Sequence, residues 1–106
     1  MEKQKISTFG EHIRTLRESA GLPIRKIAAQ LDIDPSILGK IERNDRQPTK
    51  EQIKKLALIF NQDEEYFLSE YLSDQIAYKI LEEESDINVL KVAEEKVHYL
   101  KNKKND

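Results

Sequence analysis

The chain has 106 residues, of which 38% are apolar, and this suffices for one small core with a short appended element. It contains no cysteine, which excludes disulfides and thiolate metal sites and makes a reducing cytoplasm the simpler expectation. The first twenty residues carry many charges and no apolar run, so we expect neither a signal sequence nor a membrane span. The expected location is therefore cytoplasmic.

The net charge of −2 hides a difference between the two parts of the chain. Residues 1–62 carry twelve Lys and Arg against eight Asp and Glu, whereas residues 63–106 carry six against twelve. A positive N-terminal part indicates a surface that faces a polyanion such as DNA, and a negative C-terminal part indicates a surface that avoids it. Ordinary surface charge would produce the same asymmetry, so charge alone does not decide between these interpretations.

The spacing of apolar residues predicts helices throughout, because no stretch shows the sustained alternation that a strand requires. The first helix begins at Thr8, which forms a capping box with Glu11, and Gly21 ends it. Its expected buried stripe comprises Phe9, Ile13, Leu16 and Ala20.

A second helix is expected from Pro23, a residue suited to a first helical turn, to Leu31. The connection over residues 32–34 is very short, and a third helix follows from Pro35 to Arg43 with Asp34 as its N-cap. Helices joined so tightly must cross at a steep angle, which is the geometry of a helix-turn-helix unit. The side chains expected to face inward are Ile27, Ala28, Leu31, Leu38 and Ile41.

Three more helices are expected after this unit. The fourth has a capping box formed by Thr49 and Gln52, and its apolar stripe comprises Ile53, Leu56, Ala57 and Phe60. A long fifth helix starts at Glu64 and is interrupted by residues 82–86. The last helix carries Leu90, Ala93, Val97 and Leu100 at coiled-coil spacing.

The segment from Phe9 to Leu68 resembles the Cro/repressor-like (XRE-type) helix-turn-helix domain. The joint spacing of several pieces carries the resemblance: Leu16-Arg17, Gly21-Leu22, Ile27-Ala28, Leu31, Ile33 and Ile41-Glu42-Arg43-Asn44. It implies an all-α fold, with a five-helix repressor-like DNA-binding domain over residues 1–68 and a C-terminal helical extension over residues 69–106. In such a domain the third helix lies in the major groove of double-stranded DNA.

The resemblance also implies an ion pair between Arg17 and Glu42, which would fix the third helix against the first. Such a pair is physically plausible because the guanidinium fork matches a carboxylate, although both residues could instead be solvated.

Side chains near the start of the third helix are expected to reach base edges, namely Pro35, Ser36, Ile37 and Lys40. Lys40 suits guanine O6 and N7, and Pro35 or Ile37 suits a thymine methyl group. Ile37 could instead pack with Ile41, and Lys40 could neutralise a phosphate without reading sequence. Phosphate contacts are expected from some of Arg25, Arg43, Asn44, Arg46, Thr49 and Lys50, the others being solvated.

Three departures from the family pattern affect this surface. Pro23-Ile24 replaces the common Ser-Gln pair, which removes a phosphate-binding amide that Arg25 could substitute. Asp32 stands where the family often has glycine, and Asp tolerates the left-handed region better than most residues. Gly39 inside the third helix costs about 1 kcal/mol relative to alanine unless a close approach requires it.

The C-terminal part exposes more apolar surface than a five-helix core needs, so we expect a two-fold homodimer through a helical hairpin. The residues expected at this interface are Tyr71, Leu72, Ile76, Ile80, Leu90, Ala93, Val97 and Leu100. The hairpin could instead fold back on its own domain or bind a different protein.

The two histidines, His12 and His98, are expected at the surface, and Glu94 with His98 does not complete a metal site. No nucleophile elbow or phosphate loop is present, so we expect no catalytic residues, cofactor or metal. A DNA-binding transcription regulator ranks first. An antitoxin or adaptor that uses the extension to bind a partner protein ranks second, and an enzyme ranks a distant third.

Overall fold

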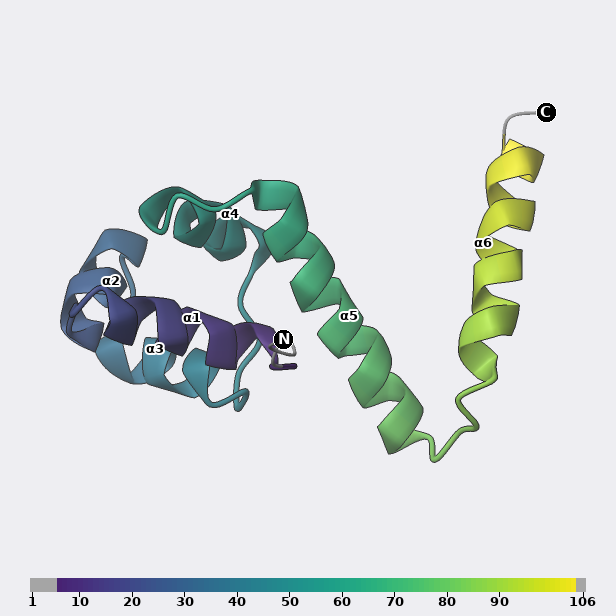
Figure 1. Ribbon diagram of the computed structural model, residues 1–106, viewed down its shortest axis with the longest axis horizontal. Helices are drawn as coiled ribbons and strands as arrows, with labels where there is room; N and C mark the ends of the chain where they lie inside the picture. Colours follow the sequence, from purple (N-terminus) through teal and green to yellow (C-terminus); the bar gives the residue numbers. More distant parts are fainter. Residues whose placement is uncertain (1–5, 105–106) are drawn as a thin grey trace, which may run out of the picture. The chain divides into compact units, whose positions relative to one another are not determined.

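The computed structural model describes residues 6–104, and these residues form helices and short connections with no strand (Figure 1). The helices are α1 (Phe9–Ser19), α2 (Ile24–Leu31), α3 (Pro35–Glu42), α4 (Lys50–Ile59), α5 (Glu64–Glu82) and α6 (Val89–Lys104). The all-α fold predicted from the sequence is confirmed. The chain divides into two compact units, Met1–Asp74 and Gln75–Asp106, and the division falls inside α5.

Helices α1 and α4 begin where their capping boxes predict. Thr8 accepts a hydrogen bond from the Glu11 amide at 3.2 Å, and the Glu11 carboxylate accepts one from the Thr8 amide at 3.0 Å. Thr49 and Gln52 form the same reciprocal pair at the start of α4. These side chains satisfy amides that the first helical turn leaves without a partner.

Helices α1 to α5 all end in the same way. The first or second residue after the helix adopts a left-handed conformation, and the next amide donates to a carbonyl five residues back, as in a Schellman motif. The left-handed residues are Gly21, Asp32, Asn44, Asn61 and Glu84. At Asp32 the φ angle is 58°, so the aspartate does take the conformation that glycine would adopt in this turn.

The core of the first unit is built from the apolar stripes of α1 to α4 and the start of α5. Its buried apolar residues are Phe9, Ile13, Ile27, Ala28, Leu31, Leu38, Ile41, Ile53, Leu56, Ala57 and Phe67. Two sequence expectations were wrong at helix ends. Ala20 is exposed because it lies at the C-cap of α1, and Pro23 is the N-cap of α2 rather than part of its first turn.

Helix α1 passes very close to α3 at Gly10, which is itself buried. A Cβ atom at this position would overlap the Ile41 carbonyl oxygen and would lie 2.8 Å from Asn44 Oδ1 and 3.0 Å from the Glu42 carbonyl oxygen. Glycine therefore permits the two helix backbones to approach, which positions the end of α3.

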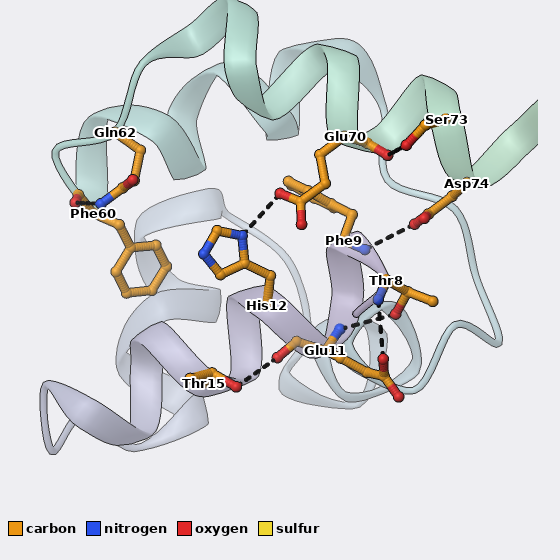
Figure 2. Close-up of polar contacts among 10 residues, drawn as sticks. All are labelled: Thr8, Phe9, Glu11, His12, Thr15, Phe60, Gln62, Glu70, Ser73 and Asp74. Atoms are coloured by element: carbon orange, nitrogen blue, oxygen red, sulfur yellow. Dashed lines mark hydrogen bonds and ion pairs between the residues drawn. The ribbon is translucent and has the colours of Figure 1, made fainter. Parts of the chain in front are cut away.

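Helix α5 is attached to α1 by aromatic contacts and by polar contacts, and Figure 2 shows the polar ones. The Phe9 and Phe67 rings meet edge to face with centroids 5.2 Å apart. Glu70 contacts His12 Nδ1 at 2.8 Å, and the Phe9 amide donates to Asp74 Oδ2 at 2.8 Å. The surface position expected for His12 was wrong, because its ring lies against Phe67 and α5 covers much of it.

The second unit comprises the last turns of α5, a short connection and α6. Every residue of α6 with a described side chain is exposed, including the apolar residues Val89, Leu90, Val92, Val97, Tyr99 and Leu100. Asp86 organises the connection, because its carboxylate accepts a hydrogen bond from the Asn88 amide at 2.8 Å just before α6.

Candidate nucleic-acid interface

Helix α3 has one face in the core and the other in solvent. Leu38, Gly39, Ile41 and Glu42 are buried, whereas the opposite face presents exposed side chains. These exposed side chains are Pro35, Ser36 and Lys40. Because Ser36 and Lys40 are four residues apart, they share one face and project in the same general direction.

Residue Ile37 lies between these two faces. It is partly buried and packs against the core, so the packing alternative foreseen from the sequence accounts for part of its surface. Ser36 is also engaged within the chain, since its hydroxyl and its amide both donate to Asp34 Oδ1, at 2.7 and 2.8 Å. These bonds lower the pKa of the fully exposed Asp34 carboxyl below its usual value, so Asp34 remains anionic at neutral pH.

An ion pair fixes the end of α3 against α1. Arg17 Nε donates to Glu42 Oε2 at 2.7 Å, and a second guanidinium nitrogen donates to Glu42 Oε1 at 3.0 Å. Another Arg17 donor reaches the Leu22 carbonyl at 2.9 Å, which ties the connection after α1 into the same network. The hydrogen bond to Glu42 raises the pKa of Arg17 despite the opposing effect of burial. This is the pair that the family resemblance implied.

The turn between α2 and α3 is held by backbone and side-chain hydrogen bonds at both of its ends. The Ile33 amide donates to the Ala28 carbonyl at 3.0 Å and closes the end of α2. Asp34 then caps α3 through the Ser36 amide. With α2 and α3 each packed into one core, the outer face of α3 is a rigid surface.

The residues expected to contact phosphates surround this outer face in sequence and are exposed: Arg25, Arg43, Asn44, Arg46, Thr49 and Lys50. Two of them make contacts within the chain that affect how freely their side chains could contact a phosphate. Arg43 Nε lies 3.4 Å from Asp45 Oδ2, in an exposed pair of the kind that contributes little to stability. The Thr49 hydroxyl accepts from the Gln52 amide, so this side chain is committed to capping α4.

A helix-turn-helix family model matches residues 13–67. The matched range begins in α1, contains α2, α3 and α4, and ends at the buried Phe67 of α5. The chain belongs to the Cro/C1-type (XRE) helix-turn-helix family. This confirms the family resemblance drawn from the sequence, and the family is one of DNA-binding transcription regulators.

Two solved structures share the fold of this Cro/C1-type chain. One is a crystal structure of SinR, the master regulator for biofilm formation, in complex with DNA, with a TM-score of 0.51 and 22% identity. This match covers 57% of this chain and 98% of the SinR chain. The other is the SinR protein/SinI protein complex, with a TM-score of 0.52 and 19% identity, covering 93% of this chain and 100% of the other. No curated protein sequence matches the chain.

Sequence reasoning missed two residues that position α3. Gly10 is one, and a glycine inside an amphipathic helix beside a buried Phe9 is a signal for a close helix approach. Asn44 is another, because its φ of 66° ends α3 and directs the chain away from it. An asparagine directly after a predicted helix is a recognisable left-handed cap.

The residues expected at the dimer interface differ in exposure. Tyr71 is partly buried, because it packs against the core, and its hydroxyl lies 3.4 Å from Gln47 Oε1. Ile80 is partly buried. The others are exposed: Leu72, Ile76, Leu90, Ala93, Val97 and Leu100. Within residues 6–104 no helix has the length and apolarity needed to cross a bilayer.

Proposed function

We propose that this chain is a cytoplasmic, sequence-specific transcription regulator that binds a pseudo-palindromic operator as a homodimer. Lys40 and Ser36 read base edges in the major groove, with Pro35 and part of Ile37 against the groove wall. Phosphates are contacted by Arg25, Arg43, Asn44, Arg46 and Lys50. The backbone amides at the N-terminus of α4, which Thr49 caps, contact a phosphate as well. A two-fold dimer presents two such reading helices about 34 Å apart, which is one turn of DNA.

The observation that carries this proposal is the outer face of α3. Lys40 projects from a helix whose opposite face is buried and whose last turn is tied to α1 by the Arg17–Glu42 pair. A rigid exposed helix can enter a groove without the loss of conformational entropy that ordering a flexible segment would require. Exposed cations on α2, α4 and the segment after α3 add a sequence-independent attraction to phosphates.

Binding to duplex DNA from upstream of its own gene, measured against random DNA over a range of salt, tests the proposal. Lys40→Ala should reduce the preference for the specific duplex, by about 1–3 kcal/mol if the contact to guanine is bidentate. Arg46→Ala should weaken all duplexes alike and reduce the salt slope by about one.

Lys91→Ala is the matched control, since Lys91 is an exposed lysine on α6. It should leave both the affinity and the salt slope unchanged. Equal affinity of the unmodified chain for the upstream duplex and for random DNA at every salt concentration would refute the proposal. So would a Lys40→Ala variant that keeps the full preference.

A second candidate function is that of an antitoxin or adaptor whose C-terminal helices bind a partner protein. The exposed apolar residues of α6 favour it, as does the fold likeness to the SinR protein/SinI protein complex over 93% of this chain. It predicts that the purified chain is monomeric and that its partner copurifies from the native source. A free homodimer with these residues already covered would count against it.

A further inference from the structure

Helix α6 carries an apolar seam along one side, formed by Leu90, Ala93, Val97 and Leu100. All four residues are exposed, with Leu90 at 41%, Val97 at 54% and Leu100 at 59%. Residues three and four apart lie on one face of a helix, so the seam is continuous from Leu90 to Leu100 within α6. A seam of this kind is suited to covering by another helix.

The charges at the two ends of this seam are opposite. Residues 101–104 include three lysines and no acid, and Lys101 and Lys103 are exposed. The last residue of α5 and the connection before α6 form an acidic corner, which comprises Glu82, Glu83, Glu84 and Asp86. Lys79 contacts Glu82 and Glu83 at 3.5 and 3.3 Å, and the corner remains negative with this one lysine included.

Helix orientation in a pair decides which of these charges meet. In a parallel pair, the lysine end of one α6 would lie beside that of its partner at an interaxial distance of about 8–10 Å, and the two acidic corners would also meet. In an antiparallel pair, each lysine end lies beside the partner's acidic corner. The two lysine ends are then separated by the helix length of about 24 Å.

We propose that α6 is covered by α6 of a second copy of this chain, running antiparallel, so that Leu90 packs near the partner's Leu100 and Ala93 near its Val97. The acidic corner of each chain then faces Lys101 and Lys103 of the other. This inference rests on the homodimer of the proposed function and adds its orientation and register.

Residues Glu94 and Lys96 flank the centre of the seam, and the antiparallel register brings each of them towards the same residue of the partner. Both are long, exposed side chains that can turn into solvent, so their repulsion is weak. In a parallel pair Lys96 would instead face the partner's Lys101 on both sides of the seam. The charges at the seam ends and flanks together favour the antiparallel orientation.

Disulfide cross-linking in the full chain tests the orientation, because the chain has no cysteine of its own. Leu90→Cys and Leu100→Cys chains carrying different tags are mixed, oxidised and resolved on a denaturing gel. We expect a disulfide between the two variants in the mixture and none within either variant alone. In the proposed register two copies of residue 100 are offset by about 15 Å, beyond the Cα separation of about 7 Å that a disulfide allows.

A second measurement covers the case in which the cysteine variants dimerise poorly. Lys101→Gln/Lys103→Gln should raise the dimer dissociation constant about fivefold at low salt, because it removes attraction to the acidic corner. The matched control Lys91→Gln, on the outward side of α6, should leave the constant unchanged. A parallel pair predicts the opposite sign, since removing the lysines would tighten the dimer.

Self-cross-linking of Leu100→Cys, or tighter dimerisation of the double glutamine variant, would overturn the antiparallel orientation while leaving the proposed function intact. A dimer of the unmodified chain that shows neither the mixed disulfide nor a weaker double variant would place its interface elsewhere and overturn the inference alone. An unmodified chain that sediments as a monomer would refute the homodimer and the orientation together. Binding of a single operator half-site would then show whether the DNA-reading part of the proposal survives.

Discussion

The close approach of α1 to α3 makes the first unit sensitive to substitution at Gly10. Replacing it by alanine places a methyl group against the Ile41 carbonyl oxygen, 2.8 Å from Asn44 Oδ1 and 3.0 Å from the Glu42 carbonyl oxygen. Two of these three atoms belong to the backbone of α3 and its last turn. The methyl group therefore cannot be accommodated by a side-chain rotation alone, and α1 must move away from α3.

The expected loss in the free energy of unfolding is the difference between two effects. Overpacking against backbone costs about 3 kcal/mol, at the upper end of the usual range for such changes. Alanine recovers about 1 kcal/mol through its higher helix propensity. The net loss of about 2 kcal/mol corresponds to a fall in Tm of about 10 °C for a domain of this size.

Thermal and urea denaturation measure this loss, and Gly39→Ala is the matched control. Gly39 is also a buried helical glycine, but an added Cβ would lie 3.3 Å from the end of the flexible Arg43 side chain and 3.7 Å from Ile24 Cδ1. Arg43 can shift, so the gain in helix propensity should dominate and Tm should stay constant or rise by a few degrees. A Gly10→Ala chain as stable as the unmodified one, or a Gly39→Ala chain that loses more than Gly10→Ala, would refute the reasoning.

The buried ion pair and Asp74 lead to two further predictions. Glu42→Ala leaves the largely buried Arg17 without its carboxylate partner, so urea denaturation should show a fall of about 3 kcal/mol in the free energy of unfolding. The double variant Arg17→Met/Glu42→Leu should show a smaller fall, because it leaves no unpaired charge. A fall in the double variant at least as large as that of Glu42→Ala would contradict this. Burial raises the pKa of Asp74 above its usual value of 3.8 despite the hydrogen bond from the Phe9 amide, so ionisation of Asp74 opposes folding. Asp74→Asn keeps the acceptor, so it should be more stable than the unmodified chain at pH 7 by less than about 1 kcal/mol, with the difference closing as the pH falls towards 3.8. Lower stability of this variant at pH 7 would show that the charge helps folding.

The starts and ends of the helices could be predicted because they depend on neighbouring residues. Thr8 and Thr49 each exchange hydrogen bonds with a residue three positions later. Gly21 and Asp32 each take up a left-handed conformation that closes the preceding helix within a few residues. Such interactions form in almost any tertiary context, so the local sequence is sufficient to identify them.

Apart from Ala20 and Pro23 at helix ends, what the sequence did not predict concerns residues whose partners lie far away in the sequence. His12 was expected at the surface because its neighbours are charged, but α5 supplies Glu70 and Phe67 to its ring. The contacts of Tyr71 with the core and with Gln47, in the segment before α4, likewise could not be foreseen from its own helix. A pattern within one helix shows which face is apolar and does not show what another helix brings against it.

The sequence by itself determined the helical class, the capping residues, the apolar stripes and the short turn that makes a helix-turn-helix unit. These features follow from hydrogen bonds and side-chain periodicities that span at most a few residues. Only the tertiary structure decided that α1 meets α3 at Gly10, that α5 is fastened to α1 through His12 and Phe9, and that Tyr71 packs against the core. Those contacts depend on the distances and angles at which whole helices cross, and such geometry arises only when all the stripes are buried together.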